Sequence, residues 1–159
     1  MRGILGLMPE QDLDVLTRLY AAFNDRDMPG MLECMDPAME VSAPEGLEYA
    51  AVMMRLLGPR GVVLLDKYSG HDEVRRLYEA LWTISARFTV DPVDFIREEG
   101  GVIVPARLRA TTADAGTEGE VQVAHLWTLA GDKVTSLRIF VDMDRAKTAL
   151  RAGREEGEE

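Results

Sequence analysis

The stretch VQVAHLWTLAGDKVTSLRIFV, residues 121–141, decides the fold of this chain. Apolar and polar residues alternate on both sides of Gly131-Asp132, which is typical of two antiparallel strands joined by a tight turn. The first strand places five residues on one face: Val121, Val123, His125, Trp127 and Leu129. The stretch therefore predicts a β-hairpin, residues 121–129 and 134–141, with an apolar face that carries a histidine.

The length of the turn decides which residues of the second strand share that face. A three-residue turn over 131–133 places His125 opposite Ile139 and adds Thr135, Leu137 and Val141 to the face. A two-residue turn places His125 opposite Arg138 instead, because a slip of one residue moves every side chain to the other face. We favour the first register, since it gathers the apolar residues of both strands on one side.

Other strands precede the hairpin. Residues 88–97 predict a strand that is bent at Asp91-Pro92, and residues 102–112 predict the next strand. Pro105 lies within the second of these, and it indicates an edge position or irregular pairing because proline cannot donate to a strand ladder. A short strand over residues 39–43 lies earlier in the chain. The sheet is therefore expected to be curved and largely antiparallel.

Two stripes of apolar residues at positions i, i+3, i+4 and i+7 predict helices. The stripes are Leu16-Leu19-Tyr20-Phe23 and Val74-Leu77-Tyr78-Leu81. Asp12 or Asp14 can cap the start of the first helix. Ser69 and Asp72 have the capping-box spacing at the start of the other helix. A short helix between them opens at Asp27 and ends at residues 36–37, because a proline pushes the preceding residue out of the helical region.

The segment 45–67 has no clear single assignment. Residues 49–57 fit a short helix, residues 58–61 fit a loop, and the apolar run 62–65 fits either a helix or a strand. Residues 144–152 predict a terminal helix, and the acidic tail 153–159 is expected to be disordered. At 159 residues the chain fits one α+β domain, residues 1–152, in which three helices of the N-terminal half pack on a mixed sheet.

Charge and composition exclude several classes of function. The net charge is −10, with 28 acidic and 18 basic residues, which disfavours nucleic acid and anionic membranes as partners. The lone Cys34 forms no intrachain disulfide, and the start of the chain does not fit a signal peptide, so we expect a cytoplasmic protein. The two histidines are far apart and no glycine-rich phosphate motif is present, so we expect neither a metal nor a cofactor.

Three groups of short motifs carry a family resemblance. They are residues 19–24, LYAAFN, followed by Asp27; residues 68–71, YSGH, followed by Val74; and the hairpin pieces VAHLW, GDKV and FVD, which begin at residues 123, 131 and 140. In this order and spacing they resemble SnoaL-like proteins of the nuclear transport factor 2-like superfamily over about residues 12–150. The resemblance implies a cone-shaped sheet closed by helices, an inner pocket and a homodimer formed through the outer sheet face. Against that pattern, segment 45–67 is an atypical insertion.

The resemblance does not supply a complete catalytic template. In ketosteroid isomerases a carboxylate base follows the first strand near a proline, but here residues 41–44 read VSAP and Glu40 has the opposite parity. SnoaL-like polyketide cyclases pair a histidine with an acid on the last strand. His125 matches the histidine, whereas the acid position falls on Ile139. Limonene epoxide hydrolase-like enzymes need an Asp-Arg-Asp cluster, and the spacing that would place Arg107, Arg109 and Asp142 in one is missing.

Two hypotheses of function follow. In the first, the cone binds a small apolar molecule such as a polyketide, terpenoid or steroid-like ring system. The predicted wall is Tyr20, Phe23, Met54, Trp82, His125, Trp127 and Ile139, and if a reaction occurs, His125 transfers the proton with help from Asp142 or Glu40. Tyr20 and Trp127 also fit plain core packing, and Asp142 also fits a helix cap.

In the second hypothesis the chain is an accessory or dimerisation module. Its cone is filled by its own side chains, and its sheet face binds a partner or a second copy. Segment 45–67 discriminates the two, because it either covers an open cavity as an adaptable methionine-bearing lid, around Met53-Met54, or fills the cone.

Overall fold

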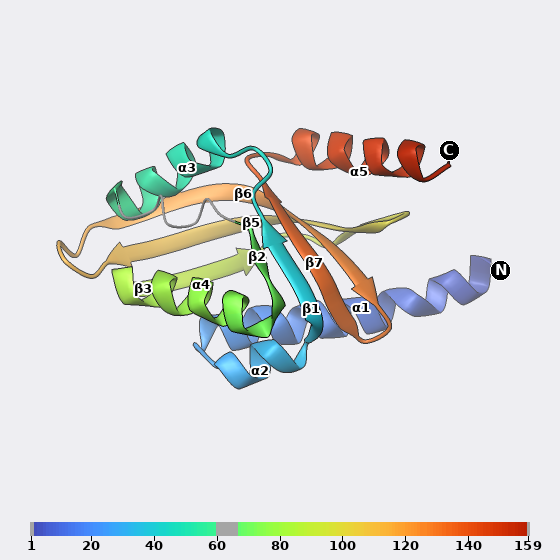
Figure 1. Cartoon of the computed structure of the whole chain (residues 1–159), viewed down its shortest axis with the longest axis horizontal. Helices are drawn as coiled ribbons and strands as arrows, with labels where there is room; N and C mark the ends of the chain where they lie inside the picture. The colour runs from blue at the N-terminus through green and yellow to red at the C-terminus, as the bar shows by residue number, and fades with distance from the viewer. Residues whose placement is uncertain (1, 60–66, 159) are drawn as a thin grey trace.

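A curved mixed sheet wraps around helices in the computed structural model, which describes the backbone of residues 2–59 and 67–158 and the side chains of residues 11–59 and 67–152 (Figure 1). The strands are β1 (Met35–Ser42), β2 (Tyr68–Ser69), β3 (Ser85–Pro92), β4 (Ile96–Glu98), β5 (Gly101–Thr112), β6 (Glu118–Ala130) and β7 (Lys133–Phe140). Their order is β2-β1-β7-β6-β5-β3, with β4 also paired to β5. Only β1 and β7 pair in parallel among the described strands, so the α+β class with a largely antiparallel sheet is confirmed.

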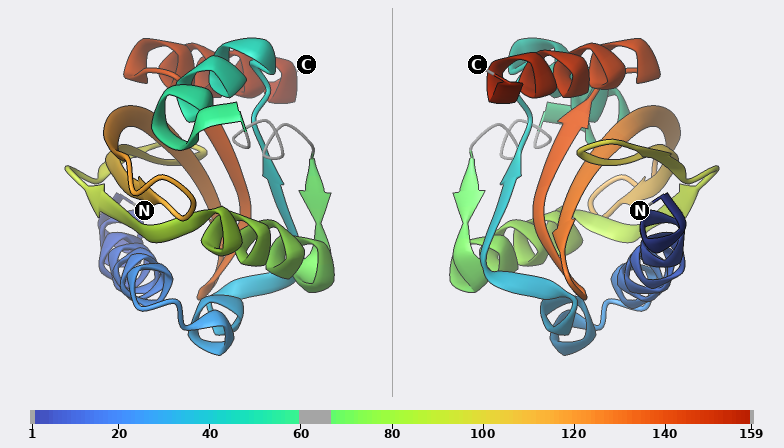
Figure 2. Two further views of the ribbon diagram at one scale, coloured as in Figure 1. Left: turned by 90° about the vertical axis from the view of Figure 1, so that its left-hand side faces the viewer. Right: turned by 90° about the vertical axis from the view of Figure 1, so that its right-hand side faces the viewer.

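The helices cover the two faces of the sheet unequally. They are α1 (Arg2–Asn24), α2 (Met28–Glu33), α3 (Leu47–Leu57), α4 (Gly70–Ile84) and α5 (Met143–Glu158). Residues of α1 to α4 share one apolar core with the inner sheet face. Helix α5 packs on the outer face, where Ala146 and Leu150 meet Ile103, Leu126 and Phe140. Figure 2 shows the strands curling around the inner side, with α3 and α5 at the same end of the molecule.

The closing hairpin has the favoured register, although its turn differs from the prediction. His125 lies opposite Ile139, and Trp127 lies opposite Leu137. The turn has two residues, since Ala130 pairs with Lys133, and a bulge between Thr128 and Leu129 shifts the ladder by one residue. An extra residue on one strand restores the alternation that a three-residue turn would give. The apolar face is therefore confirmed, and the reason for it is the bulge.

Of the two alternatives predicted from Pro105, the edge position is wrong and the irregular pairing is confirmed. Strand β5 is interior, between β6 on one side and β3 with β4 on the other. Pro105 lies beside the break between Pro92 and Ile96, where its carbonyl accepts a hydrogen bond from the N–H of Val93 at 2.8 Å. In an extended chain the N and C=O of one residue point to the same side, so the missing N–H faces this break and leaves the β6 ladder intact.

Two predicted boundaries near the N-terminus are also wrong. Helix α1 begins at Arg2, so Asp12 and Asp14 lie inside it and cap nothing. Helix α2 ends at Glu33 and β1 already begins at Met35. The predicted start of α2 is confirmed, since the Asp27 side chain accepts a hydrogen bond from the N–H of Gly30 at 3.1 Å. Glycines and a proline at positions 3, 6 and 9 lower helix propensity, which is why the apolar pattern alone places the start of α1 too late.

The other helices follow the sequence more closely. Helix α4 buries Val74, Leu77, Tyr78 and Leu81, as the stripe predicts. Its start is tied by Glu73, which accepts a hydrogen bond from the N–H of Ser69, and not by Asp72. Helix α3 confirms the expected helix in segment 45–67, while the apolar run 62–65 lies outside the described residues. Helix α5 extends past Ala152 to Glu158. Within the described residues, no helix is long and apolar enough to cross a membrane.

Candidate functional site

A cavity of about 70 Å³ lies between the inner sheet face and helices α1 to α4. Among the described residues, its walls are apolar apart from the Trp127 indole N–H, Ser42, His125 and the hydroxyls of four tyrosines: Tyr20, Tyr49, Tyr68 and Tyr78. None of the described residues that line the cavity is an acidic residue, a lysine or an arginine. A nearly apolar space with a few converging polar groups is the usual composition of a small-molecule site.

Three side chains form a hydrogen-bonded chain along one wall of this cavity. The indole N–H of Trp127 donates to the Tyr20 hydroxyl at 2.9 Å. The Tyr20 hydroxyl in turn lies 2.7 Å from Nδ1 of His125. All three side chains are at least nine-tenths buried. Helix α1 supplies Tyr20, and the alternation of β6 brings His125 and Trp127 to the same face.

This chain of hydrogen bonds determines which nitrogen of His125 carries the proton. An indole N–H is only a donor, so Tyr20 uses its oxygen to accept from Trp127. The Tyr20 proton is then free to point at Nδ1 of His125, which must accept it. The opposite tautomer leaves the Tyr20 proton without a partner and loses about one hydrogen bond, roughly 1 kcal/mol. His125 therefore carries its proton on Nε2.

The side chain of His125 lines the cavity, and its Nε2 is not enclosed by protein atoms. Among the described residues it makes no hydrogen bond, and the same holds for the hydroxyls of Tyr49 and Tyr78. The single described side-chain nitrogen or oxygen that is fully enclosed without a partner is Nε1 of Trp82. His125, Tyr49 and Tyr78 all line the cavity, so their unpaired polar atoms are open to it.

Burial holds these groups in their neutral forms. It lowers the pKa of His125 to about 4, because the imidazolium ion is poorly solvated in this apolar environment. Burial likewise raises the pKa of Tyr20, Tyr49 and Tyr78 above the range of ordinary phenols. At neutral pH the cavity therefore presents an imidazole N–H and phenol O–H groups, with no charge among them.

The structure brings most of the predicted site residues together. Tyr20, Phe23, His125, Trp127 and Ile139 all line the cavity. Two predicted wall residues do not. Met54 points outward and is 41% exposed. Trp82 packs beside Phe23, with their ring centroids 5.7 Å apart, outside the lining.

The acids predicted to assist His125 are not at the cavity. Asp142 is exposed, and its carboxylate accepts a hydrogen bond from the N–H of Arg145 at 2.9 Å, which caps α5. Glu40 is also exposed and pairs with Lys67 at 3.3 Å. Neither carboxylate can orient or protonate His125, because each is turned to a different surface. Tyr20 occupies the orienting position that an acid was expected to fill.

The epoxide hydrolase-like cluster is likewise not assembled. Arg107 and Arg109 both pair with Glu120 on the outer sheet face, at 3.8 Å and 2.9 Å. No group of three or more metal-binding side chains gathers within the part of the chain that the structure describes.

Sequence reasoning did not assign Tyr49 and Tyr78 to the cavity wall, and it named Met53 only as part of the predicted lid. Tyr49 and Met53 are four positions apart on α3, so they share a face, whereas Met54 falls on the opposite side. Tyr78 belongs to the predicted apolar stripe of α4 and was interpreted as core alone. The spacing of Tyr49, Met53 and Leu56 could have identified the inner face of α3. These three residues lie at i, i+4 and i+7, and all three are buried.

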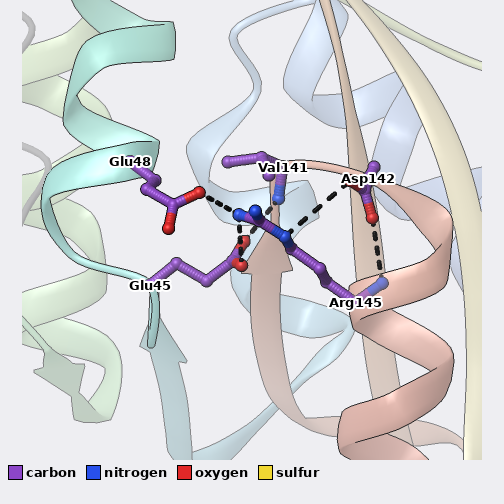
Figure 3. Close-up of polar contacts among 5 residues, drawn as sticks. All are labelled: Glu45, Glu48, Val141, Asp142 and Arg145. Atoms are coloured by element: carbon purple, nitrogen blue, oxygen red, sulfur yellow. Dashed lines mark hydrogen bonds and ion pairs between the residues drawn. The ribbon is translucent and has the colours of Figure 1, made fainter.

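Helix α3 carries the lining residues Tyr49 and Met53 and is fastened at its start (Figure 3). Just before α3, the Glu45 carboxylate accepts hydrogen bonds from the N–H of Val141 at 2.7 Å and from Arg145 at 2.8 Å. Arg145 also binds Glu48, in the first turn of α3. At the other end, the backbone of Leu56 packs closely against Gly119, where an added Cβ would lie 3.2 Å from the Leu56 carbonyl oxygen. These contacts hold Tyr49 and Met53 over the cavity.

Several solved structures share this fold. TerC, co-crystallised with polyporic acid, is 24% identical with a TM-score of 0.66, and the match covers 88% of this chain and 97% of TerC. A nuclear transport factor 2-like protein of unknown function from Burkholderia pseudomallei is 20% identical with a TM-score of 0.66, over 89% and 95% of the two chains. A proposed SnoaL-like polyketide cyclase from a Jannaschia species is 19% identical with a TM-score of 0.64, over 89% and 92%.

At these identities the likeness shows the fold alone. The sequence profile of the SnoaL-like domain matches residues 16–137, which is most of the chain. No curated protein shows a significant sequence match.

Proposed function

The chain belongs to the SnoaL-like domain family, and on this premise we propose that its cavity binds a small, uncharged, largely apolar molecule through one oxygen atom. Nε2–H of His125 donates a hydrogen bond to that oxygen. The observation that carries the proposal is an imidazole N–H that is buried, oriented by Tyr20 and unpaired in an apolar space. Leaving such a donor without a partner costs about 1–3 kcal/mol, which an oxygen of a ligand would recover.

The absence of charge in the described lining favours an uncharged ligand. Moving an ion into an apolar cavity without a counterion is strongly unfavourable. The His125 imidazole is neutral, so it supplies a donor and not a positive charge. A ketone, ester, amide or phenol oxygen fits this donor. The co-crystallisation of TerC with polyporic acid supports a ligand-binding role for the fold.

The size of the cavity limits what enters without rearrangement. A volume of about 70 Å³ is small beside the roughly 300–1,000 Å³ of most ligand pockets. A ring-sized ligand therefore displaces a lining side chain. Met53 is best suited to move, because it is unbranched, lies on α3 and is the methionine that faces the cavity beside Tyr49.

The chemistry that His125 can supply is polarisation of a carbonyl. A neutral imidazole N–H that donates to a carbonyl oxygen stabilises the negative charge that develops there when the carbonyl is attacked or enolised. Acting as the base would require a proton-free Nε2, which the hydrogen bond from Tyr20 to Nδ1 disfavours. Any reaction in this cavity therefore uses His125 as the electrophilic group.

Ligand-observed NMR with acetophenone tests the proposal. Acetophenone is one ring with one carbonyl, and wild-type protein should bind it in the millimolar range or better. His125→Phe removes the donor and should weaken binding at least about 10-fold, the equivalent of about 1.4 kcal/mol. His71→Gln is the matched control, because His71 lies outside the cavity and bonds the Met35 carbonyl. Equal binding by wild type and His125→Phe would refute the role of His125.

The small volume also favours a second candidate, an accessory protein whose cone is filled by its own side chains. Met53→Ala separates the two candidates because it removes the side chain that a ligand must displace. A binding site should gain affinity for acetophenone when Met53 is truncated. A self-filled cone should lose stability, by about 2–4 kcal/mol, and bind nothing in either form.

A further inference from the structure

The cavity holds a second set of unpaired polar atoms besides Nε2 of His125. Tyr49 and Tyr78 are only 4% and 9% exposed, yet neither hydroxyl bonds any described residue. Both line the cavity, and neither is enclosed as Nε1 of Trp82 is. A buried hydroxyl without a partner costs roughly 1–3 kcal/mol. These two hydroxyls are therefore placed to receive a partner from the cavity itself.

The two hydroxyls stand on helices, whereas His125 stands on the sheet. Tyr49 is on α3 and Tyr78 is on α4, so they reach the cavity from elements other than β6, which carries His125. Each phenol lies within electrostatic reach of the other, and that proximity adds to the burial that raises the pKa of Tyr49. Phe23 packs edge-on against Tyr78, with their ring centroids 5.5 Å apart, and fixes the ring. The two phenols thus add neighbouring hydroxyls to a wall that is mostly apolar.

We propose that Tyr49 and Tyr78 form a second polar pole, which binds a second oxygen atom of the molecule that His125 holds by its first. This inference rests on the proposed function and narrows its substrate class. The ligand is an uncharged ring compound with oxygen substituents at two separate positions, such as a hydroxyketone or a quinone. A hydroxyl can both donate and accept, so the pole receives a carbonyl oxygen or a second hydroxyl equally well.

The pole would act as a selectivity device. A molecule with a single oxygen satisfies His125 and leaves both phenols unpaired, whereas a molecule with two oxygens satisfies both poles. Each recovered hydrogen bond is worth on the order of 1 kcal/mol or more, so a correctly placed second oxygen should tighten binding about 10-fold. A second oxygen at the wrong ring position should be rejected, because it would be buried against apolar side chains.

Acetophenone and its 2′-, 3′- and 4′-hydroxy derivatives test the pole, with dissociation constants measured by ligand-observed NMR. Wild-type protein should bind one hydroxy isomer about 10-fold more tightly than acetophenone. Tyr49→Phe and Tyr78→Phe should each reduce that advantage, and the double variant should abolish it. Phenylalanine keeps the ring, so both variants should fold. The dissociation constant of acetophenone is measured for each protein as the reference, so that the advantage is a ratio of two constants in the same variant.

The outcomes separate this inference from the proposed function. If acetophenone binds and His125→Phe weakens it, but no hydroxy isomer gains affinity, the pole is refuted while the proposed function stands. An advantage that survives in the double variant also refutes the pole, since the second oxygen then binds elsewhere. Binding of none of the four probes, by wild type or by Met53→Ala, overturns both.

Discussion

His125 is an ionisable residue in a place where only its neutral form is stable. In the unfolded chain its pKa is about 6.5, and in the fold burial lowers that pKa to about 4. Between pH 6.5 and pH 4 the unfolded chain binds a proton that the folded chain does not, so the free energy of unfolding falls as the pH falls. The window of about 2.5 units corresponds to a loss of about 3 kcal/mol.

Denaturant unfolding at several pH values between 7 and 4 measures this loss. His125→Gln keeps a neutral polar side chain but does not titrate, so the variant should lose about 3 kcal/mol less than wild type over the same range. Carboxylates contribute equally to both proteins, and their effect cancels in the comparison. Parallel pH profiles for the two proteins would show that His125 protonates as readily in the fold as outside it.

Tyr20 and Tyr78 are both buried phenols, but among the described residues only the Tyr20 hydroxyl has hydrogen-bond partners. Tyr20→Phe leaves the Trp127 N–H and Nδ1 of His125 without their hydrogen bonds, and we expect it to cost about 2–4 kcal/mol. Tyr78→Phe deletes a hydroxyl that bonds no described residue, so stability should change by less than about 0.5 kcal/mol or rise. Urea unfolding at pH 7 compares the two, and equal costs would contradict the hydrogen-bonded chain described above.

The sequence predicts individual residues well where a strict alternation applies. Parity along β6 places His125 and Trp127 on one face, and both line the cavity as expected. The inner face of a short helix is harder to predict. The sequence predicts Met54 as a wall residue, but Met53 lines the cavity and Met54 is exposed. Hydroxyl partners cannot be predicted from spacing at all. The bond from Tyr20 to His125 joins residues 105 positions apart and exists only in the folded chain.

At the scale of elements, α3 decides access to the cavity. Glu45→Ala removes the carboxylate that holds Val141 and Arg145, so the start of α3 should open more often. Hydrogen exchange measured by mass spectrometry should show amides of residues 49–57 exchanging at least about 10-fold faster, with β6 unchanged.

Glu48→Ala is the matched control for this prediction. Among the described residues, the Glu48 carboxylate pairs with Arg145 alone, and the Glu48 side chain is 60% exposed, so the pair resembles an ordinary surface ion pair. Exchange in α3 should therefore change less than about 3-fold in this variant. If Glu45→Ala and Glu48→Ala accelerate α3 alike, the bond from Val141 to Glu45 does not fasten the helix.

The sequence predicts the bend at Pro92 and the irregular pairing at Pro105, but it predicts neither the bulge in the hairpin nor the interior position of Pro105. The bulge near Thr128 gives the hairpin its register with a two-residue turn, and nothing in the local composition separates it from a three-residue turn. The interior position of Pro105 depends on the break between β3 and β4, which belongs to a neighbouring strand. Both features depend on the neighbouring strand in the sheet, so the strand propensity of a single residue cannot predict them.

In the whole molecule, α5 limits how a second copy of the chain can dock on the outer sheet face. The resemblance implies a homodimer through this face, which stays a prediction. Helix α5 already covers Ile103, Leu126 and Phe140 there. The neighbouring outer surface of β5 and β6 carries Arg107, Arg109 and Glu120 in ion pairs. A second copy that docks without moving α5 must therefore meet a polar surface.

Removing α5 should turn the outer face into an association surface. A chain that stops after Asp142 exposes side chains that are now 5% exposed or less, and such a contiguous apolar patch promotes self-association. Sedimentation velocity should show the truncated chain forming larger species than the full chain at the same concentration. Leu150→Asp should reproduce the effect in the full chain, because Leu150 is buried against the sheet, while the neighbouring Arg151→Asp should not, because Arg151 is exposed. If the truncated chain sediments as the full chain does, α5 is not what keeps this apolar surface from associating.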